Sequence, residues 1–238
     1  MHPLFIVGLI CAAVTAAVMP YYCKITFQGK NKRTLAVKMF LSSLFLLTAI
    51  LSLFSHSVRH DYMYVMLIGF IMDYIGDYVL GKSERTSYFV AGSACFAVGH
   101  ILYACAFSMA EKRMFPQVGW WNRMEVGIFL TVTCLMLLII LLKKPSVDVM
   151  LAAMFVYCLI VTLMLCKASG LAIRMLPDAP AMLMAPVGGV CFLLSDYMLG
   201  MMRFKMHKKT FAFKSACTAA YYVAQTLMAL SMFILIRH

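Results

Sequence analysis

Long apolar runs separated by short charged segments constrain this chain more than any other feature. Of its 238 residues, 64% are hydrophobic and only 13% are charged. A soluble domain of this length cannot bury so much apolar surface, and a disordered chain contains far less of it. The sequence therefore predicts an integral membrane protein, with residues 1–238 as a single membrane domain.

A helix crosses the hydrocarbon core of a bilayer with about 20 apolar residues. Suitable runs cover residues 3–19, 34–54, 61–81, 87–109, 124–142, 147–167, 180–202 and 210–236. They are too long and too uniformly apolar for barrel strands. The first run has no basic segment before it, so we interpret it as a membrane span rather than a cleaved signal peptide. We expect an all-α membrane protein, a bundle of eight transmembrane helices.

The net charge of +12 would be compatible with nucleic-acid binding, but the lysines and arginines cluster in the short loops between the apolar runs. Such clusters are typical of the loops that set the orientation of a membrane protein. Thirteen lysines and arginines flank the loops after the odd-numbered runs, and seven lie on the other side. This bias predicts that both termini face outward. No nucleic-acid partner is expected. We expect a multi-pass protein of the bacterial cytoplasmic membrane, or of the endoplasmic reticulum if the source is eukaryotic.

The nine cysteines stand singly, with no CxxC motif and no cluster with histidine. Scattered thiols in apolar runs act as small hydrophobic side chains. We therefore expect neither disulfides nor a zinc site.

An internal repeat links the third and fourth runs to the seventh and eighth. "GDYVLGK…SACFAVGHILYA" resembles "SDYMLGM…SACTAAYYVAQTLMA", which aligns Asp77 with Asp196. Lys38 precedes Asp77 by 39 residues, and Tyr157 precedes Asp196 by the same interval. The pattern predicts a 4+4 parallel repeat with halves 1–122 and 123–238 and its axis along the membrane normal.

Aspartates inside apolar runs are the strongest functional signal, because an ionisable group in a span is energetically costly. Asp77 and Asp196 are the candidate catalytic pair. The alternative is structural, with Asp77 bridged to Lys38 and Asp196 held by hydrogen bonds. Asp73 lies one turn before Asp77 and is interpreted as a supporting residue.

Further polar side chains in the same runs are candidates for substrate binding. We expect Lys38 to neutralise a carboxylate or to bind a phosphate, and His100 is a candidate for proton transfer. Ser195 lacks a GxSxG context, so a serine hydrolase is not expected. The other candidates are Tyr103, Tyr157, Tyr221, Tyr222 and Gln225, for which helix–helix hydrogen bonding is the alternative role.

Four stretches, "GDYVLG", "GSACFAVGHILYA", "GGVCFLLSDYMLGMMRF" and "YYVAQTLM", resemble the signatures of the YhhN-like, or lysoplasmalogenase, family. The resemblance covers essentially the whole chain, although "LAVKMFLSS" lacks the proline that often follows the lysine in that family. It implies an eight-span hydrolase that cleaves the vinyl ether bond of lysoplasmalogens. The products would be a fatty aldehyde and glycerophosphoethanolamine or glycerophosphocholine, with Asp77 and Asp196 as catalytic acids.

The chemistry of a vinyl ether fits two buried carboxyl groups. Hydrolysis begins with protonation at carbon and passes through an oxocarbenium ion, as in glycosidases. Asp77, beside Lys38, suits the ionised role, and Asp196 suits the proton donor. The partners would be a lysophospholipid substrate and the bilayer, and the reaction requires no cofactor and no metal.

Two other functions fit the same residues. Buried Asp, Lys and His in a pseudo-symmetric bundle also suit a small-molecule or proton-coupled transporter. Carriers often have spans broken by Gly or Pro, and here Pro186 near "APVGG" is the main candidate for such a break. A non-catalytic scaffold or lipid sensor is the third alternative.

Overall fold

The computed structural model describes residues 2–119, 121–143, 149–204 and 208–235. Three of the cations counted above, Lys144, Lys205 and Arg237, lie outside these ranges, as do the expected span limits at 147 and 236.

The described residues form eight α-helices and one short 3-10 helix, and they contain no β-strand. The elements are α1 (Pro3–Gln28), α2 (Lys32–Phe54), α3 (Asp61–Lys82), α4 (Thr86–Met114), α5 (Arg123–Lys143), α6 (Val149–Met175), η1 (Pro180–Leu183), α7 (Met184–Arg203) and α8 (Phe211–Ser231). By length and composition, α1, α2, α3, α4, α6 and the segment from η1 through α7 are able to cross a membrane. The prediction of an all-α membrane protein is confirmed.

Local sequence signals set several of these helix ends. Gly29 follows α1 with φ of 136°, a conformation that glycine adopts without strain. Asn31 then starts α2 with a capping box, in which its side chain accepts from the Thr34 N–H and the Thr34 hydroxyl accepts from the Asn31 N–H. Two adjacent helices are thereby separated by a very short turn.

The prolines lie differently from the sequence interpretation. Helix α1 continues through Pro20 to Gln28, well beyond the expected end at residue 19. Pro186 lies in the first turn of α7, where a missing N–H costs little, and η1 precedes α7 within the same candidate span. The interruption expected near "APVGG" corresponds to the junction between η1 and α7.

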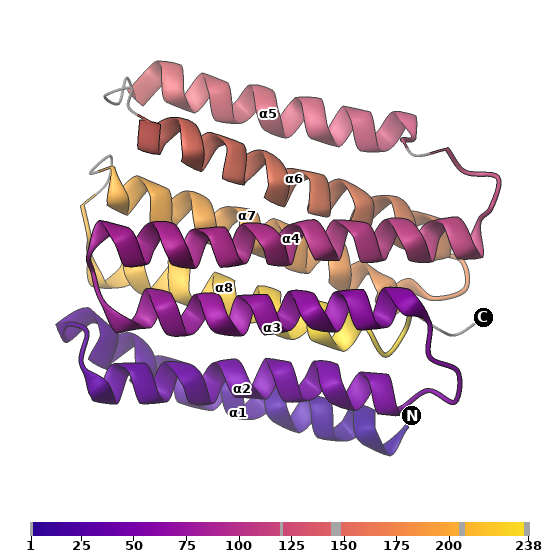
Figure 1. The fold of residues 1–238 in the computed structure, drawn as a ribbon, viewed down its shortest axis with the longest axis horizontal. Helices are drawn as coiled ribbons and strands as arrows, with labels where there is room; N and C mark the ends of the chain where they lie inside the picture. Colours follow the sequence, from indigo (N-terminus) through magenta and orange to yellow (C-terminus); the bar gives the residue numbers. More distant parts are fainter. Residues whose placement is uncertain (1, 120, 144–148, 205–207, 236–238) are drawn as a thin grey trace.

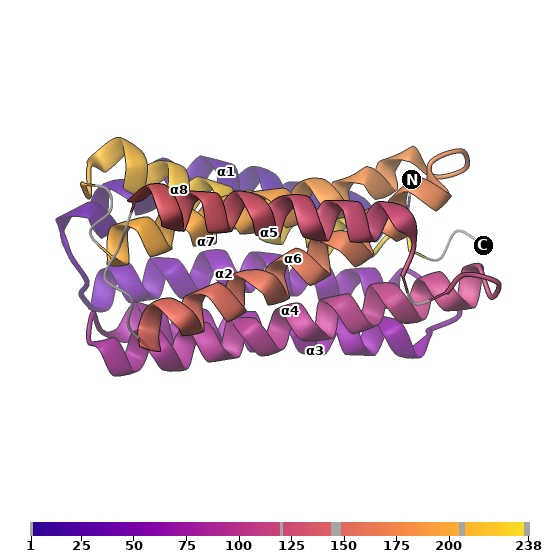
Figure 2. The same cartoon turned by 90° about the horizontal axis from the view of Figure 1, so that it is seen from above.

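Six helices form a ring, in which α2 packs on α3, α3 on α4, α4 on α6, α6 on α7, α7 on α8 and α8 on α2. Helix α1 lies outside the ring against α2 and α8, and α5 packs only on α6 among the described residues. All eight helices run roughly along the long axis (Figures 1 and 2). In the view of Figure 1, α5 lies at one edge and α1 and α2 lie at the other. The start of α1 and the end of α8 lie at the same end of the bundle (Figure 1).

Paired glycines bring α3 and α4 into close contact. A Cβ placed on Gly99 would lie 3.2 Å from the Gly69 carbonyl oxygen, and one on Gly92 would lie 3.2 Å from the Gly76 oxygen. Small residues let membrane helices approach until their backbones touch. This contact fixes the register of α3, and with it the positions of Asp73 and Asp77.

Candidate functional site

Asp77, on α3, is held by side chains from two other helices, α2 and α8. Its Oδ1 lies 2.8 Å from Lys38 Nζ on α2. Its Oδ2 accepts hydrogen bonds from Ser42, also on α2, at 2.5 Å and from Tyr221 on α8 at 2.7 Å. A carboxylate with an ammonium partner and two hydroxyl donors has the surroundings of an ionised group.

Asp196 on α7 has different surroundings. The Tyr157 hydroxyl on α6 donates to Asp196 Oδ2 over 2.8 Å, and His100 Nε2 on α4 lies 3.9 Å from the same oxygen. The Asp196 side chain is 12% exposed, against 1% for Asp77, so it is the more accessible carboxyl group. No lysine or arginine pairs with it in the described part of the chain.

His100 is fully buried beside Asp196. Neither ring nitrogen has a hydrogen-bond partner among the residues that the structure describes, and the rings of Phe192, Tyr157 and Tyr103 surround it at centroid distances of 4.8, 5.9 and 6.0 Å. A small shift would bring Nε2 within hydrogen-bond reach of Asp196.

Asp73 belongs to a second polar group, one helical turn from Asp77. Its Oδ2 accepts from Tyr103 at 2.9 Å and from Gln225 at 2.7 Å. The Gln225 amide also lies 3.1 Å from the Tyr221 hydroxyl, which donates to Asp77. A continuous chain of hydrogen bonds therefore connects Asp73 to Asp77 through α8.

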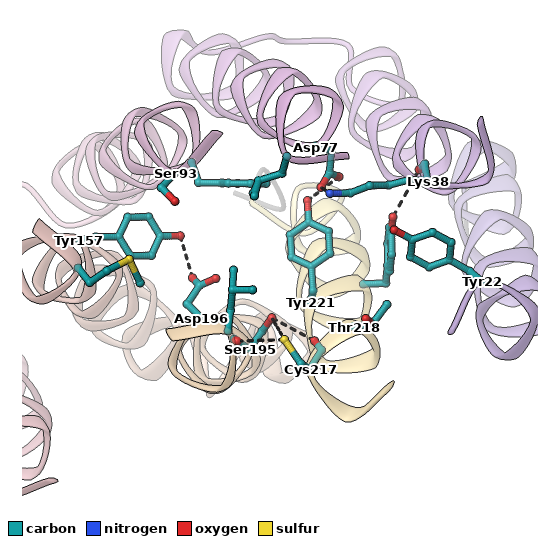
Figure 3. A pocket seen from close by; sticks show the side chains of 15 residues that line it. Tyr22, Lys38, Asp77, Ser93, Tyr157, Ser195, Asp196, Cys217, Thr218 and Tyr221 are labelled. Carbon is teal, nitrogen blue, oxygen red and sulfur yellow. Dashed lines mark hydrogen bonds and ion pairs between the residues drawn. The ribbon is translucent and has the colours of Figure 1, made fainter. Parts of the chain in front are cut away.

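A cavity of about 120 Å³ separates the two catalytic candidates. Asp77 with Lys38 lies on one side and Asp196 with Tyr157 on the other, and Tyr221 projects between them (Figure 3). The lining residues are Tyr22, Lys38, Asp77, Leu80, Ser93, Phe96, Met154, Tyr157, Ser195, Asp196, Leu199, Cys217, Thr218, Tyr221 and Tyr222. Carboxyl groups from α3 and α7 thus face one cavity.

The residues expected at the site divide into two sets. Those that line the cavity are Lys38, Asp77, Tyr157, Ser195, Asp196, Tyr221 and Tyr222. Those that lie behind it are Asp73, His100, Tyr103 and Gln225, which are buried and do not form its wall.

Two lining residues are tied to neighbouring backbone. Ser195 donates to the Cys217 carbonyl at 3.1 Å, which joins α7 to α8. The Tyr222 hydroxyl makes a long contact of 3.4 Å to the Lys38 carbonyl and a side-chain hydrogen bond to Ser42. Both residues shape the wall more than they present free polar groups to the cavity.

Sequence reasoning missed Ser42, which contacts Asp77, and also the wall residues Tyr22, Ser93, Cys217 and Thr218. Ser42 follows Lys38 by four residues and therefore shares its helix face, a signal that could have identified it. Tyr22 lies beyond the expected end of the first span, so no hydropathy pattern could place it at the site.

The site has the composition of an acid–base centre. It offers two carboxyl groups, a lysine and several tyrosine hydroxyls, and the described residues contain no group of three His, Cys, Asp or Glu side chains that could hold a metal ion. A helical membrane protein with a two-carboxylate cavity inside its bundle is the class that the fold and the site define.

Residues 33–232 match the sequence profile of the YhhN family. The chain therefore belongs to the YhhN family, the lysoplasmalogenase-like family that its motifs resemble. Comparison with curated proteins and with solved structures gives no significant match.

Proposed function

We propose that the protein is a lysoplasmalogenase, which hydrolyses the vinyl ether bond of 1-alkenyl-glycerophosphoethanolamine or 1-alkenyl-glycerophosphocholine. Membership of the YhhN family supports a hydrolase of this general type. The observation that carries the specific proposal is the placement of Asp77 and Asp196 on opposite sides of one cavity, in unlike surroundings.

The unlike surroundings assign the two roles. Asp77, with the Lys38 ammonium at 2.8 Å, is the ionised carboxylate. Asp196, more accessible and hydrogen-bonded by the neutral Tyr157 hydroxyl, is the proton donor. Unlike environments divide such roles between carboxyl pairs in other enzymes that form oxocarbenium ions.

The reaction then proceeds in balanced steps. Asp196 gives its proton to the outer carbon of the double bond, and the carbon attached to oxygen becomes an oxocarbenium ion stabilised by Asp77. Water adds to that carbon while Asp77 takes a proton, which yields a hemiacetal. Collapse breaks the bond to the glycerol oxygen, which receives the proton from Asp77, while the hemiacetal hydroxyl returns a proton to Asp196. The products are the aldehyde and the glycerophospho-alcohol.

We propose that all eight helices span the membrane and that the chain is a 4+4 duplication. The packing pairs support this arrangement, because α2, α3 and α4 pack in sequence as α6, α7 and α8 do. The Lys38–Asp77 contact joins α2 to α3 as the Tyr157–Asp196 contact joins α6 to α7, over the same interval of 39 residues. The charge bias of the loops supports termini that face outward.

A proton-coupled carrier is the second candidate. The hydrogen-bonded chain from Asp73 through Gln225 and Tyr221 to Asp77 favours it, since such chains move protons in membrane carriers. A carrier would bind or move its substrate without releasing aldehyde, and this difference separates the two candidates.

Aldehyde release from 1-alkenyl-lysophosphatidylethanolamine by the purified protein in detergent tests the proposal. We expect wild type to release aldehyde and both Asp77→Asn and Asp196→Asn to lose about 10²–10⁴-fold of the rate. Asp61→Asn is the matched control, because Asp61 lies in the first turn of α3, outside the site. A folded wild type that releases no aldehyde, or folded Asn variants that keep the rate, would refute the assignment.

A further inference from the structure

Asp196 borders a second cavity besides the one it shares with Asp77. This cavity, of about 60 Å³, lies between α5, α6 and α7. Asp196 and Met154 line both spaces, so together they form the partition between them. A molecule that occupies both cavities must pass directly beside the Asp196 carboxyl group.

The two cavities differ sharply in chemistry. The first carries Lys38, Asp77 and several hydroxyl groups. In the second, Asp196 and the Tyr197 side chain are the polar members, and the rest of the wall is mainly apolar. Its apolar residues include Met136 and Ile139 from α5, Leu151 and Phe155 from α6, Met201 from α7, and Phe204 directly after α7.

A polar cavity that shares a wall with an apolar cavity fits an amphiphile with one chain. Its charged headgroup would be bound near Lys38, and its chain would lie among the methionine and aliphatic side chains, which adapt to chain shape. The bond that links head to chain would then lie at the partition, next to Asp196. This is the position that a vinyl ether must occupy to be protonated there.

We propose that the cavity between α5, α6 and α7 is the chain-binding subsite, and that the first carbons of the substrate chain enter it while the remainder stays in the bilayer. This inference rests on the proposed function for the identity of the reacting bond, but not for the binding of a chain. The peripheral position of α5 supports it: α5 packs only on α6 among the described residues, so the space beside α7 lies at the edge of the bundle.

Gly200 offers a way to fill this subsite. A Cβ built on Gly200 has one close neighbour, Met154 Cε at 3.6 Å, which is ordinary contact, so a side chain fits on the backbone there. The longer side chain of Gly200→Leu would occupy the space proposed for the substrate chain. Gly127→Leu on α5 is the matched control, because a Cβ on Gly127 meets nothing within 4 Å and Gly127 does not line the cavity.

The experiment compares long-chain 1-alkenyl-lysophosphatidylethanolamine with its two-carbon ethenyl analogue, whose chain ends at the reacting double bond and therefore leaves the subsite empty. We expect Gly200→Leu to reduce the long-to-short ratio of kcat/KM by roughly tenfold, the effect of excluding two or three methylene groups from a subsite. Gly127→Leu should leave that ratio at the wild-type value. An unchanged ratio in a folded, active Gly200→Leu variant would overturn the proposal. If this variant does not fold, Cys158→Phe fills the same cavity from α6 and carries the same expectation.

A binding measurement separates this inference from the proposed function. Saturated 1-alkyl analogues have no vinyl ether and cannot be cleaved, so their long-to-short ratio of Kd reports chain binding alone. A Kd ratio reduced by Gly200→Leu supports the subsite even if wild type releases no aldehyde. Aldehyde release with Kd and kcat/KM ratios that neither filling variant changes would leave the hydrolase intact and refute the subsite.

Discussion

The Lys38 ammonium lies 2.8 Å from Asp77 Oδ1, and the two groups are almost enclosed by the bundle, with exposed fractions of 14% and 1%. Charges in such a place are stable only when they are paired. The pair therefore serves both stability and the site, and substitutions can separate these two contributions.

Lys38→Met should lower the free energy of unfolding by about 3–5 kcal/mol, because it leaves the Asp77 carboxylate buried without a counter-charge. Thermal unfolding in detergent measures the change. The double variant Lys38→Met/Asp77→Asn should recover most of the loss while remaining inactive, and Lys82→Met, at an exposed position on α3, should have little effect. A Lys38→Met protein as stable as wild type would show that the ion pair does not stabilise the folded protein.

Tyr221→Phe should reduce kcat/KM by about 10–100-fold, because it removes the hydroxyl that joins Gln225 to Asp77. Tyr78→Phe is the control, because Tyr78 is exposed on α3 and does not line the cavity. Its hydroxyl is not part of the hydrogen-bonded chain from Asp73 to Asp77, so steady-state kinetics should change by no more than a few-fold. Equal losses in the two variants would contradict a specific role for Tyr221.

Gly99→Ala should destabilise the protein by about 1–3 kcal/mol. The new methyl group would collide with Asp73 Oδ1 and lie 3.2 Å from the Gly69 carbonyl, so α3 and α4 would have to separate. Gly127→Ala, in open space on α5, should be neutral or stabilise by up to about 1 kcal/mol. Thermal unfolding of both variants tests the prediction, which fails if Gly99→Ala unfolds at the wild-type temperature.

Much of the fold follows from hydropathy, since a run of about 20 apolar residues must become a helix in a bilayer. The contact between Lys38 and Asp77 could be anticipated as an ion pair inside apolar runs. The contact between Tyr157 and Asp196 was not expected, although the shared interval of 39 residues was a signal for it. Spacing could not show that α5 lies outside the ring, because that depends on which helix faces fit together.

Other features were beyond a local pattern. Helix α1 continues through Pro20 because it loses only one backbone hydrogen bond there and keeps those of the rest of the long helix. A hydropathy pattern contains no information about backbone hydrogen bonds, so it could not predict this. The Asp73 group forms from α3, α4 and α8, and its members carry no signal beyond being polar in apolar runs. The second cavity beside Asp196 arises from the way the helices pack together, so no single residue in the sequence predicts it.

Lys30, in the turn between α1 and α2, gives the protein a pH dependence of known sign. Its Nζ donates to the carbonyls of Leu80 and Ser83 at 2.5 and 3.0 Å. Partial burial of this ammonium group, and then repulsion from Lys38, lower the pKa of Lys30 from 10.5 to about 8. Between pH 8 and 10.5 the unfolded chain therefore binds more protons than the native protein, so the Lys30 contribution to stability rises with pH.

Thermal unfolding from pH 7 to 10 should show that the unfolding temperature of Lys30→Met rises less steeply with pH than that of wild type. Lys24→Met, which removes the same charge from an exposed position of α1, should keep the wild-type slope. A parallel shift of the Lys30→Met curve, with no change in slope, would show that Lys30 keeps an ordinary pKa in the folded protein.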